Sequence, residues 1–116
     1  MRHRNKVKTL GRKKSPREMM LRNLAASILI YEKVKTTEAK AKTVRTLVEK
    51  IITTAKKGDL ASYRQLISIL PQPMAIKKSV EVLSKRYKER KGGYTRIIRL
   101  NKRQGDAAPI VQIELI

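Results

Sequence analysis

Residues 94–116 read YTRIIRLNKRQGDAAPIVQIELI, and their apolar side chains recur with a period near two, not with the helical period of about 3.6. Tyr94–Leu100 is rich in strand-forming residues, although two adjacent isoleucines leave its buried face undecided. Ile110–Ile116 alternates cleanly between apolar and polar side chains. Because the intervening Asn101–Pro109 is polar and contains Gly-Asp, we expect two strands joined by a long hairpin loop.

The chain ahead of this stretch has helical periodicity, apart from one short segment. Lys33–Thr36 alternates between charged and uncharged residues, which suits a brief strand between two helices. Pro71 and the pair Gly92-Gly93 interrupt the helical pattern later in the chain. We therefore expect four helices, over about residues 15–31, 37–57, 60–70 and 74–91.

The expected helix ends carry recognisable signals. Ser15 can cap a backbone N–H, Pro16 suits the first helical position, and Glu18 completes a capping box. The other signals are Thr36 or Thr37 as the cap of the second helix, Gly58 as its terminator, and Asp59 as the cap of the third.

The apolar stripes of the helices predict what the core contains. The second helix presents Ala41, Val44, Val48, Ile51, Ile52 and Ala55 on one side, and the third presents Leu60, Tyr63, Leu66, Ile67 and Leu70. We expect a two-layer α+β fold of order α-β-α-α-α-β-β, with the helices packed on a small mixed sheet. Residues 1–14 would form a basic, extended N-terminal arm, and residues 15–116 a single domain.

Positive charge dominates the composition. The chain has 29 Lys and Arg against nine Asp and Glu, a formal net charge of +20. Self-repulsion of this size indicates a polyanionic partner, of which nucleic acid is the densest source. Within the first seventeen residues no acid offsets the eight cations, which are Arg2, Arg4, Lys6, Lys8, Arg12, Lys13, Lys14 and Arg17.

A second basic cluster spans residues 86–103, with Glu89 as its single acid. The contact residues predicted from it are Arg90, Lys91, Arg96, Arg99, Lys102 and Arg103. It runs through a helix end, a turn, a strand and a loop, which one solvated helix face would not do. Gly92-Gly93 either simply ends the helix or also brings backbone N–H groups close to phosphate.

The same composition argues against catalysis. His3 is the sole histidine, so no histidine-based triad or metal cluster can form, and we expect it to be a contact residue. The carboxylates of Glu38, Glu49, Glu81 and Glu114 fall singly on faces expected to be exposed. There the i,i+4 pairs Glu38–Lys42 and Arg45–Glu49 should form. We expect no cofactor, metal, small-molecule substrate or membrane partner, and a cytoplasmic location.

Several strings together resemble the bacterial large-subunit ribosomal protein family L-seventeen. They are MRHR at 1–4, LGR at 10–12, TTEAKAK at 36–42, GGYTRI at 92–97, and GDAAP at 105–109 followed by IEL at 113–115. The resemblance implies a structural constituent of the large subunit that binds ribosomal RNA and touches neighbouring large-subunit ribosomal proteins. It also implies RNA contacts at Arg2, His3, Arg4, Arg12, Arg17, Arg22, Arg96 and Arg103.

Two other classes of protein fit the charge alone. A DNA-compacting protein would usually show an apolar wedge or a dimer-forming helix pair, and we find neither pattern. A basic nuclease would need an acid–base or metal-binding constellation that the sequence does not supply. The resemblance, not the charge, favours RNA over DNA.

Overall fold

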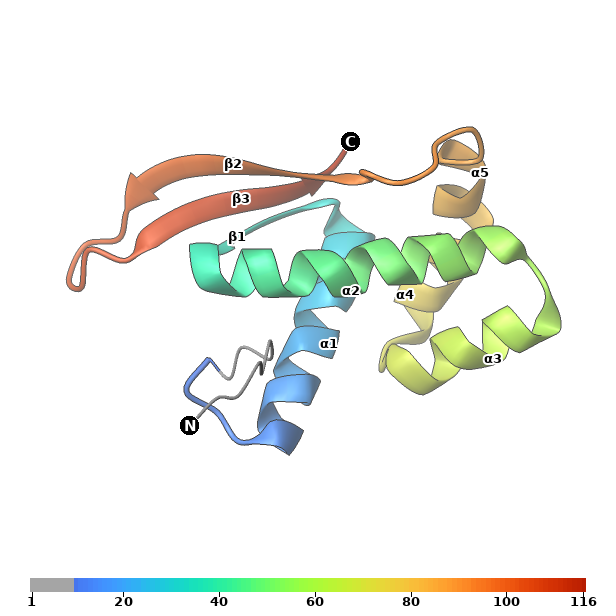
Figure 1. The fold of residues 1–116 in the computed structure, drawn as a ribbon, viewed down its shortest axis with the longest axis horizontal. Helices are drawn as coiled ribbons and strands as arrows, with labels where there is room; N and C mark the ends of the chain where they lie inside the picture. The colour runs from blue at the N-terminus through green and yellow to red at the C-terminus, as the bar shows by residue number, and fades with distance from the viewer. Residues whose placement is uncertain (1–9) are drawn as a thin grey trace, which may run out of the picture.

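Two strands at the C-terminal end form a hairpin, and the long helices pack on one side of the sheet to which it belongs (Figure 1). The computed structural model describes residues 10–116. Its elements are α1 (Lys14–Tyr31), β1 (Lys33–Thr37), α2 (Glu38–Lys57), α3 (Leu60–Ile69), α4 (Pro73–Lys78), the π-helical η1 (Ser79–Leu83), α5 (Ser84–Arg86), β2 (Thr95–Lys102) and β3 (Pro109–Leu115). The predicted α+β class and element order are confirmed, with α4, η1 and α5 following one another where the fourth helix is expected.

The sheet has the order β1-β3-β2 and is antiparallel throughout. In its centre Ile113 pairs with Ile97 on one side and with Val34 on the other. The expectation of a mixed sheet is therefore wrong in this detail. β1 follows α1 almost directly, and the Leu115 N–H donates to the Glu32 carbonyl at 2.9 Å, next to the Lys33–Glu114 pair that ends the antiparallel register of β1 and β3.

The core lies between the sheet and the crossed helices α1 and α2 (Figure 1). The stripe predicted for α2 is confirmed, because all six of its members are fully or almost fully buried. From α1 the cluster takes Ala25, Ala26, Ile28 and Leu29, and from β3 it takes Val111, Ile113 and Leu115. Aliphatic side chains from the first helix to the last strand thus share one hydrophobic cluster.

The start of α1 differs from the prediction. The helix begins at Lys14, and its N-cap is Lys13, whose side chain makes no capping hydrogen bond. The Arg17 N–H already donates to the Lys13 carbonyl at 3.0 Å, so Ser15 lies inside the first turn and cannot cap it. Pro16 still lies in that turn, where its missing N–H leaves no helical hydrogen bond unmade.

The ends of α2 and α3 follow the sequence signals more closely. Thr37 is the N-cap of α2, although its side chain makes no capping bond. Gly58 ends that helix with φ +72°, a left-handed conformation that favours glycine. The Asp59 carboxylate accepts the Ser62 N–H at 2.7 Å, which confirms it as the cap of α3.

The stripe predicted for α3 is wrong in three of its five residues. Leu66 and Leu70 are buried, but Leu60, Tyr63 and Ile67 are exposed. α3 packs against α2 and α4 along its other side, which carries the buried Ser62 and Leu66. Leu60, Tyr63 and Ile67 share a face of the helix, and nothing in residues 10–116 covers these three side chains.

Candidate nucleic-acid interface

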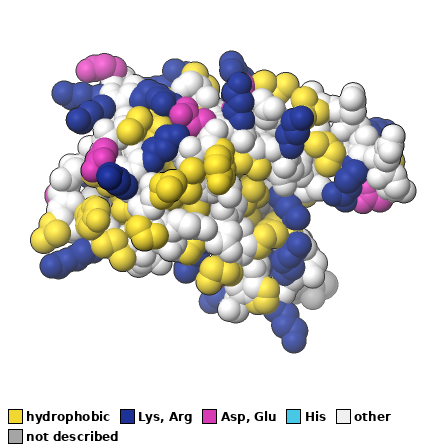
Figure 2. Space-filling model, turned by 180° about the vertical axis from the view of Figure 1, so that it is seen from behind, with side chains coloured by type: hydrophobic (Ala, Val, Ile, Leu, Met, Phe, Trp, Pro, Cys, Tyr) yellow, Lys and Arg dark blue, Asp and Glu magenta, His cyan; other side chains and the backbone are white. Residues whose placement is uncertain are grey.

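Most of the positive charge is not used in ion pairs. Residues 10–116 contain 25 of the basic residues and all nine acids. Six of these cations have a carboxylate within 4 Å, namely Lys42, Lys78, Arg86, Arg96, Arg99 and Arg103. The other nineteen cations in this part of the chain have none. Lys and Arg side chains project around most of the outline of the molecule (Figure 2).

The N-terminal group of predicted contacts lies at the entry to α1. Arg12, Lys13 and Lys14 are exposed there, and Arg17 and Arg22 are half-buried further along the helix. The remaining predicted contacts of the arm, Arg2, His3, Arg4, Lys6 and Lys8, lie outside the described residues. The structure thus places Arg12 and Lys13 just before α1 and the other three cations of this group along its first half.

Arg22 also borders a hollow of about 310 Å³ between α1 and α2. Lys50, Thr43 and Thr46 line the opposite side of this hollow, and all three come from α2. The Thr43 hydroxyl donates to the Ala39 carbonyl at 2.8 Å, which leaves its oxygen able to accept a further hydrogen bond. Glu18, Leu21 and Leu47 complete the lining, so the hollow holds one carboxylate beside its two cations and two hydroxyls, a mixed set that suits ribose hydroxyls as well as phosphate.

The six predicted contact residues of the second basic cluster are distributed along β2. Arg90 and Lys91 lie before the strand, Arg96 and Arg99 within it, and Lys102 and Arg103 at its far end. Eight residues of strand span roughly 25 Å at about 3.3 Å per residue. These six cations, which we call the β2 ridge, are therefore spread along the strand and over both of its faces, and they do not form one compact patch.

Carboxylates hold three of the ridge arginines. Arg96 donates from Nε and Nη2 to Glu114 Oε1, at 3.0 and 2.8 Å, on the face of the sheet opposite α2. Arg99 reaches Glu38 at the start of α2, with 3.5 Å between Nη2 and Oε1. Arg103 pairs with Asp106 in the hairpin loop.

The expectation that Glu114 is exposed is wrong. Its cross-strand neighbours are Lys33 and Arg96, and with these long side chains beside it only 5% of the residue is accessible. Hydrogen bonding from Arg96 lowers the pKa of Glu114 below its ordinary value, because these bonds favour the charged carboxylate. The expected Glu38–Lys42 pair, by contrast, is confirmed at 2.9 Å.

Two residues of α2 fix the turn that leads into the ridge. Glu49 accepts the N–H groups of Tyr94 and Thr95 at 3.1 and 3.2 Å, and the Thr95 hydroxyl at 2.9 Å. Lys56 donates to the Arg90 carbonyl and, at 3.1 Å, to the Tyr94 hydroxyl. Glu49 is therefore used by the turn, and the expected Arg45–Glu49 ion pair is not formed.

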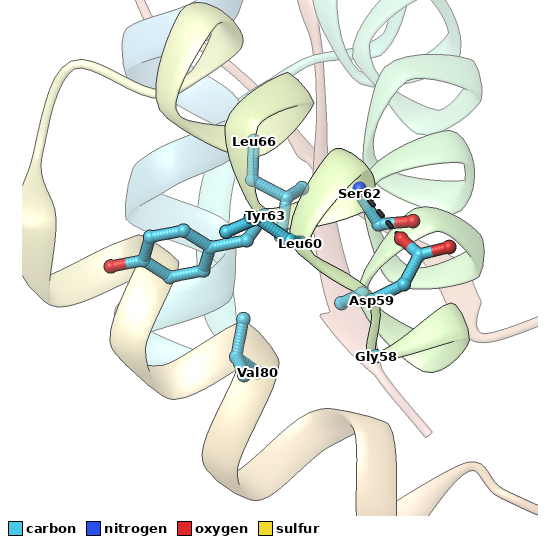
Figure 3. Close-up of a pocket in the computed structure, with 8 residues that line it drawn as sticks. Gly58, Asp59, Leu60, Ser62, Tyr63, Leu66 and Val80 are labelled. Atoms are coloured by element: carbon cyan, nitrogen blue, oxygen red, sulfur yellow. Dashed lines mark hydrogen bonds between the residues drawn. The ribbon is translucent and has the colours of Figure 1, made fainter.

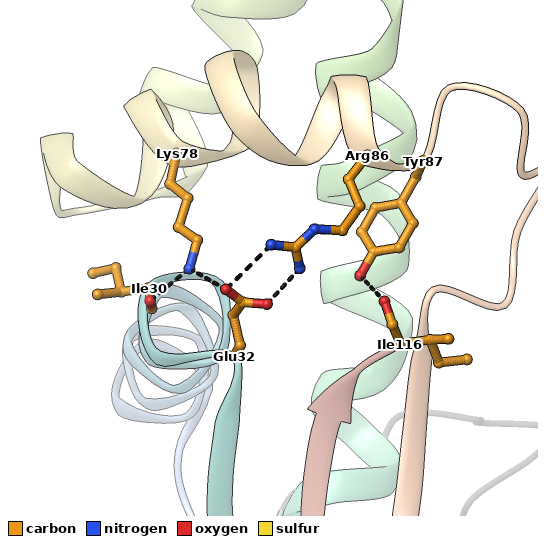
Figure 4. A network of polar contacts seen from close by, with 6 residues as sticks. All are labelled: Ile30, Glu32, Lys78, Arg86, Tyr87 and Ile116. Atoms are coloured by element: carbon orange, nitrogen blue, oxygen red, sulfur yellow. Dashed lines mark hydrogen bonds and ion pairs between the residues drawn. The ribbon is translucent and has the colours of Figure 1, made fainter.

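Glu32 ties the end of α1 to the last helices (Figure 4). Its carboxylate accepts from Arg86 and, at 2.9 Å, from Lys78, whose ammonium also reaches the Ile30 carbonyl at 2.8 Å. The residue has φ +66°, so it turns the chain from α1 into β1. Nothing local in the sequence marks Glu32, because its partners lie 46 and 54 residues away.

Acid should weaken this contact. Hydrogen bonds from Arg86 and then Lys78 lower the pKa of Glu32 from 4.5 to about 2. A lowered pKa stabilises the fold fully above about pH 4.5, and that stabilisation is lost as the pH falls towards 2. Glu32 is about one-third exposed, so after solvent screening we expect Glu32→Gln to cost about 1 to 2 kcal/mol at pH 7. Urea unfolding should show the wild-type advantage shrinking from pH 5 to pH 2.5; an advantage constant with pH would contradict this prediction.

The remaining side chains offer little for catalysis. Across residues 10–116 no three His, Cys, Asp or Glu side chains come together in a way that could hold a metal ion. Six of the nine carboxylates accept hydrogen bonds within the fold, those of Glu32, Glu38, Glu49, Asp59, Asp106 and Glu114. None of the described helices is long and apolar enough to cross a membrane.

A small α+β fold whose acids brace the structure while its cations face outwards is typical of proteins that bind nucleic acid.

Comparison with known proteins gives the family. The family model described as Ribosomal protein L17 matches residues 20–116. The chain is 47% identical to large ribosomal subunit protein bL17 of Pelobacter propionicus over all of its length and 91% of the relative. It is 46% identical to bL17 of Trichlorobacter lovleyi, again over its whole length and over 94% of the relative. Over 92% of the chain and 96% of the relative, it is 49% identical to bL17 of Caldanaerobacter subterraneus. The chain belongs to the ribosomal protein L17 family, which confirms the resemblance found in its sequence.

Proposed function

We propose that the chain is a structural constituent of the large ribosomal subunit, which binds and neutralises large-subunit ribosomal RNA without any turnover. The observation that carries this proposal is the excess of cations without carboxylate partners in residues 10–116. Packed RNA helices present dense phosphate, and cations held on a rigid fold can neutralise it at defined positions. The relatives' name, large ribosomal subunit protein, supports the choice of RNA over DNA.

In this proposal the chain binds RNA at two places, which together form a two-part grip. Residues 1–14 act as an arm, while the folded part from residue 15 onwards supplies Arg17 and Arg22 on α1 and the β2 ridge. Arg90, Lys91 and Lys102 have no ion-pair partner among residues 10–116, so they are the ridge cations most available to phosphate. Arg96, Arg99 and Arg103 are held in place by carboxylates and would present the remaining N–H groups of their guanidinium forks.

The wider context follows from the same role. The partners are large-subunit ribosomal RNA and neighbouring large-subunit ribosomal proteins, and the place of action is the ribosome in the cytoplasm. Recognition would rest on backbone and shape, because the chain has four Tyr and no Phe or Trp for stacking on bases.

Sedimentation tests this function directly. We expect the tagged chain to remain with large subunits through a gradient wash at high salt, and to bind a large-subunit RNA transcript more tightly than duplex DNA of equal length. Lysozyme, another small basic protein, is the control and should be washed off. Equal affinity for the transcript and the duplex would contradict the ribosomal assignment.

A further inference from the structure

α3 carries an apolar stripe that its own core does not use. Leu60, Tyr63 and Ile67 follow one another at i, i+3 and i+7, and they are 65%, 44% and 52% exposed. On the same helix, Leu66 is the apolar side chain that is buried in the core. Apolar side chains at this spacing usually mark a face that is covered.

Beside the stripe lies a hollow of about 320 Å³ between α3 and η1. Figure 3 shows Leu60, Tyr63 and Val80 around its opening, and the hydrogen bond from Ser62 to Asp59 off to one side. Ala55 and Leu66 complete the apolar lining. Such a hollow suits one large aliphatic or aromatic side chain, the usual centre of a protein–protein interface.

The charge of this region argues against RNA as the occupant. From residue 59 to residue 76 the chain has one acid, Asp59, and one base, Arg64, whereas the whole chain has a net charge of +20. Hydrophobic side chains gather at the end of the molecule formed by α3 and α4, at the lower left of Figure 2. Because phosphate contact needs cations, this face suits contact with another protein better than contact with RNA.

We propose that the α3 face docks a different protein of the large subunit, which inserts a large apolar side chain into the hollow between α3 and η1. This inference rests on the proposed function and names a surface for one of its partners. A second copy of this chain is disfavoured, because two molecules of net charge +20 repel each other. A neutral or acidic neighbour would meet no such repulsion.

The absence of cysteine makes the surface easy to probe. Ile67→Cys places a single thiol in the stripe, and Gln65→Cys places one on the polar, exposed side of the same helix as a matched control. Both variants would be incorporated into large subunits, where the rate at which each thiol reacts with a maleimide is measured. In a second preparation each chain would be labelled with a maleimide–benzophenone crosslinker before incorporation and then irradiated in the subunit. RNase digestion followed by mass spectrometry then separates protein crosslinks from RNA crosslinks.

We expect both thiols to react equally in the free chain. In the subunit the Ile67→Cys thiol should react at least about tenfold more slowly, because an interface centre excludes solvent, and it should crosslink to another protein. Unchanged reactivity in the subunit, a crosslink to RNA, or a crosslink to a second copy would each overturn the inference while leaving the proposed function standing. A chain that fails to sediment with large subunits would overturn both.

Discussion

Removing residues 2–14 should lower the salt dependence of RNA binding more than any other change to the chain. The segment contains seven Lys and Arg and no acid. Each lost phosphate contact removes about 0.7 to 0.9 from the slope of log K against log salt concentration, so loss of most of these contacts should reduce the slope by about 3 to 6. Filter binding of a large-subunit RNA transcript between 50 and 300 mM salt, over which the Debye length falls from about 14 Å to about 6 Å, measures it.

Variants that keep residues 2–14 but change their side chains separate the effect of the arm's charge from that of its length. Replacing the same seven cations by Ser should reproduce the effect of deletion, whereas exchanging every Arg for Lys should leave the slope within about 0.5 of the original. An unchanged slope on deletion would show that the arm does not bind RNA. Replacing Lys91 and Lys102 by Ala should remove a further part of the slope, about 1.5, if both contact phosphate.

Tyr94→Ala should be the most damaging point substitution for stability. Tyr94 is 2% exposed, and its ring lies 5.1 Å from that of Tyr87, with the Lys56 ammonium 5.2 Å from its centre. Its loss leaves a cavity where α2 holds the turn into β2, so we expect a cost of about 3 to 5 kcal/mol. For a domain whose total stability is about 5 to 15 kcal/mol, that is a large fraction.

The conservative variant shows which part of Tyr94 matters. Tyr94→Phe keeps the ring and removes the contacts of the hydroxyl with Lys56 and the Arg90 carbonyl, so it should cost about 1 kcal/mol. Urea unfolding followed by circular dichroism measures both variants. Similar losses for Ala and Phe would show that the hydroxyl network, not the packing, stabilises the turn.

Local pattern predicts the elements of this fold well. The stripe of α2 and the hairpin of β2 and β3 were predictable because period and turn chemistry act between residues close in sequence. α3 shows the limit of such reasoning, since a period reveals which residues share a face but not which face the fold covers. Leu60, Tyr63 and Ile67 are exposed although their spacing is that of a core helix, whereas Leu66 and Leu70 of the same predicted stripe are buried.

Long-range polar contacts could not be predicted for a related reason. Glu49 has Arg45 one helical turn away, and an exposed pair of that kind contributes a few tenths of a kcal/mol. The alternative partners of Glu49 are the backbone N–H groups of Tyr94 and Thr95. Leaving these two groups unpaired in a part-buried turn would cost about 1 to 3 kcal/mol each, which is more than the ion pair with Arg45 contributes. The turn therefore takes the carboxylate, and a residue 45 positions distant decides what Glu49 does.

For the basic residues, too, the sequence revealed their number but not which carboxylates they pair with in the fold. Their number already indicated a polyanionic partner, but the sequence did not reveal that carboxylates hold Arg96, Arg99 and Arg103. It predicted that the cluster runs through a strand, but not that Arg96 and Arg99 pair with acids on opposite faces of that strand. We infer that the acids of this chain position part of the ridge for phosphate and leave the net positive charge in place.

A map of RNA crosslinks within intact large subunits tests the two-part grip most directly. After ultraviolet irradiation and nuclease digestion, mass spectrometry should find nucleotides attached to peptides from residues 2–17 and from residues 86–103, and none attached to α3. Crosslinks confined to one of the two basic segments would reduce the grip to a single site. The absence of crosslinks from both, in subunits that contain the chain, would contradict the account.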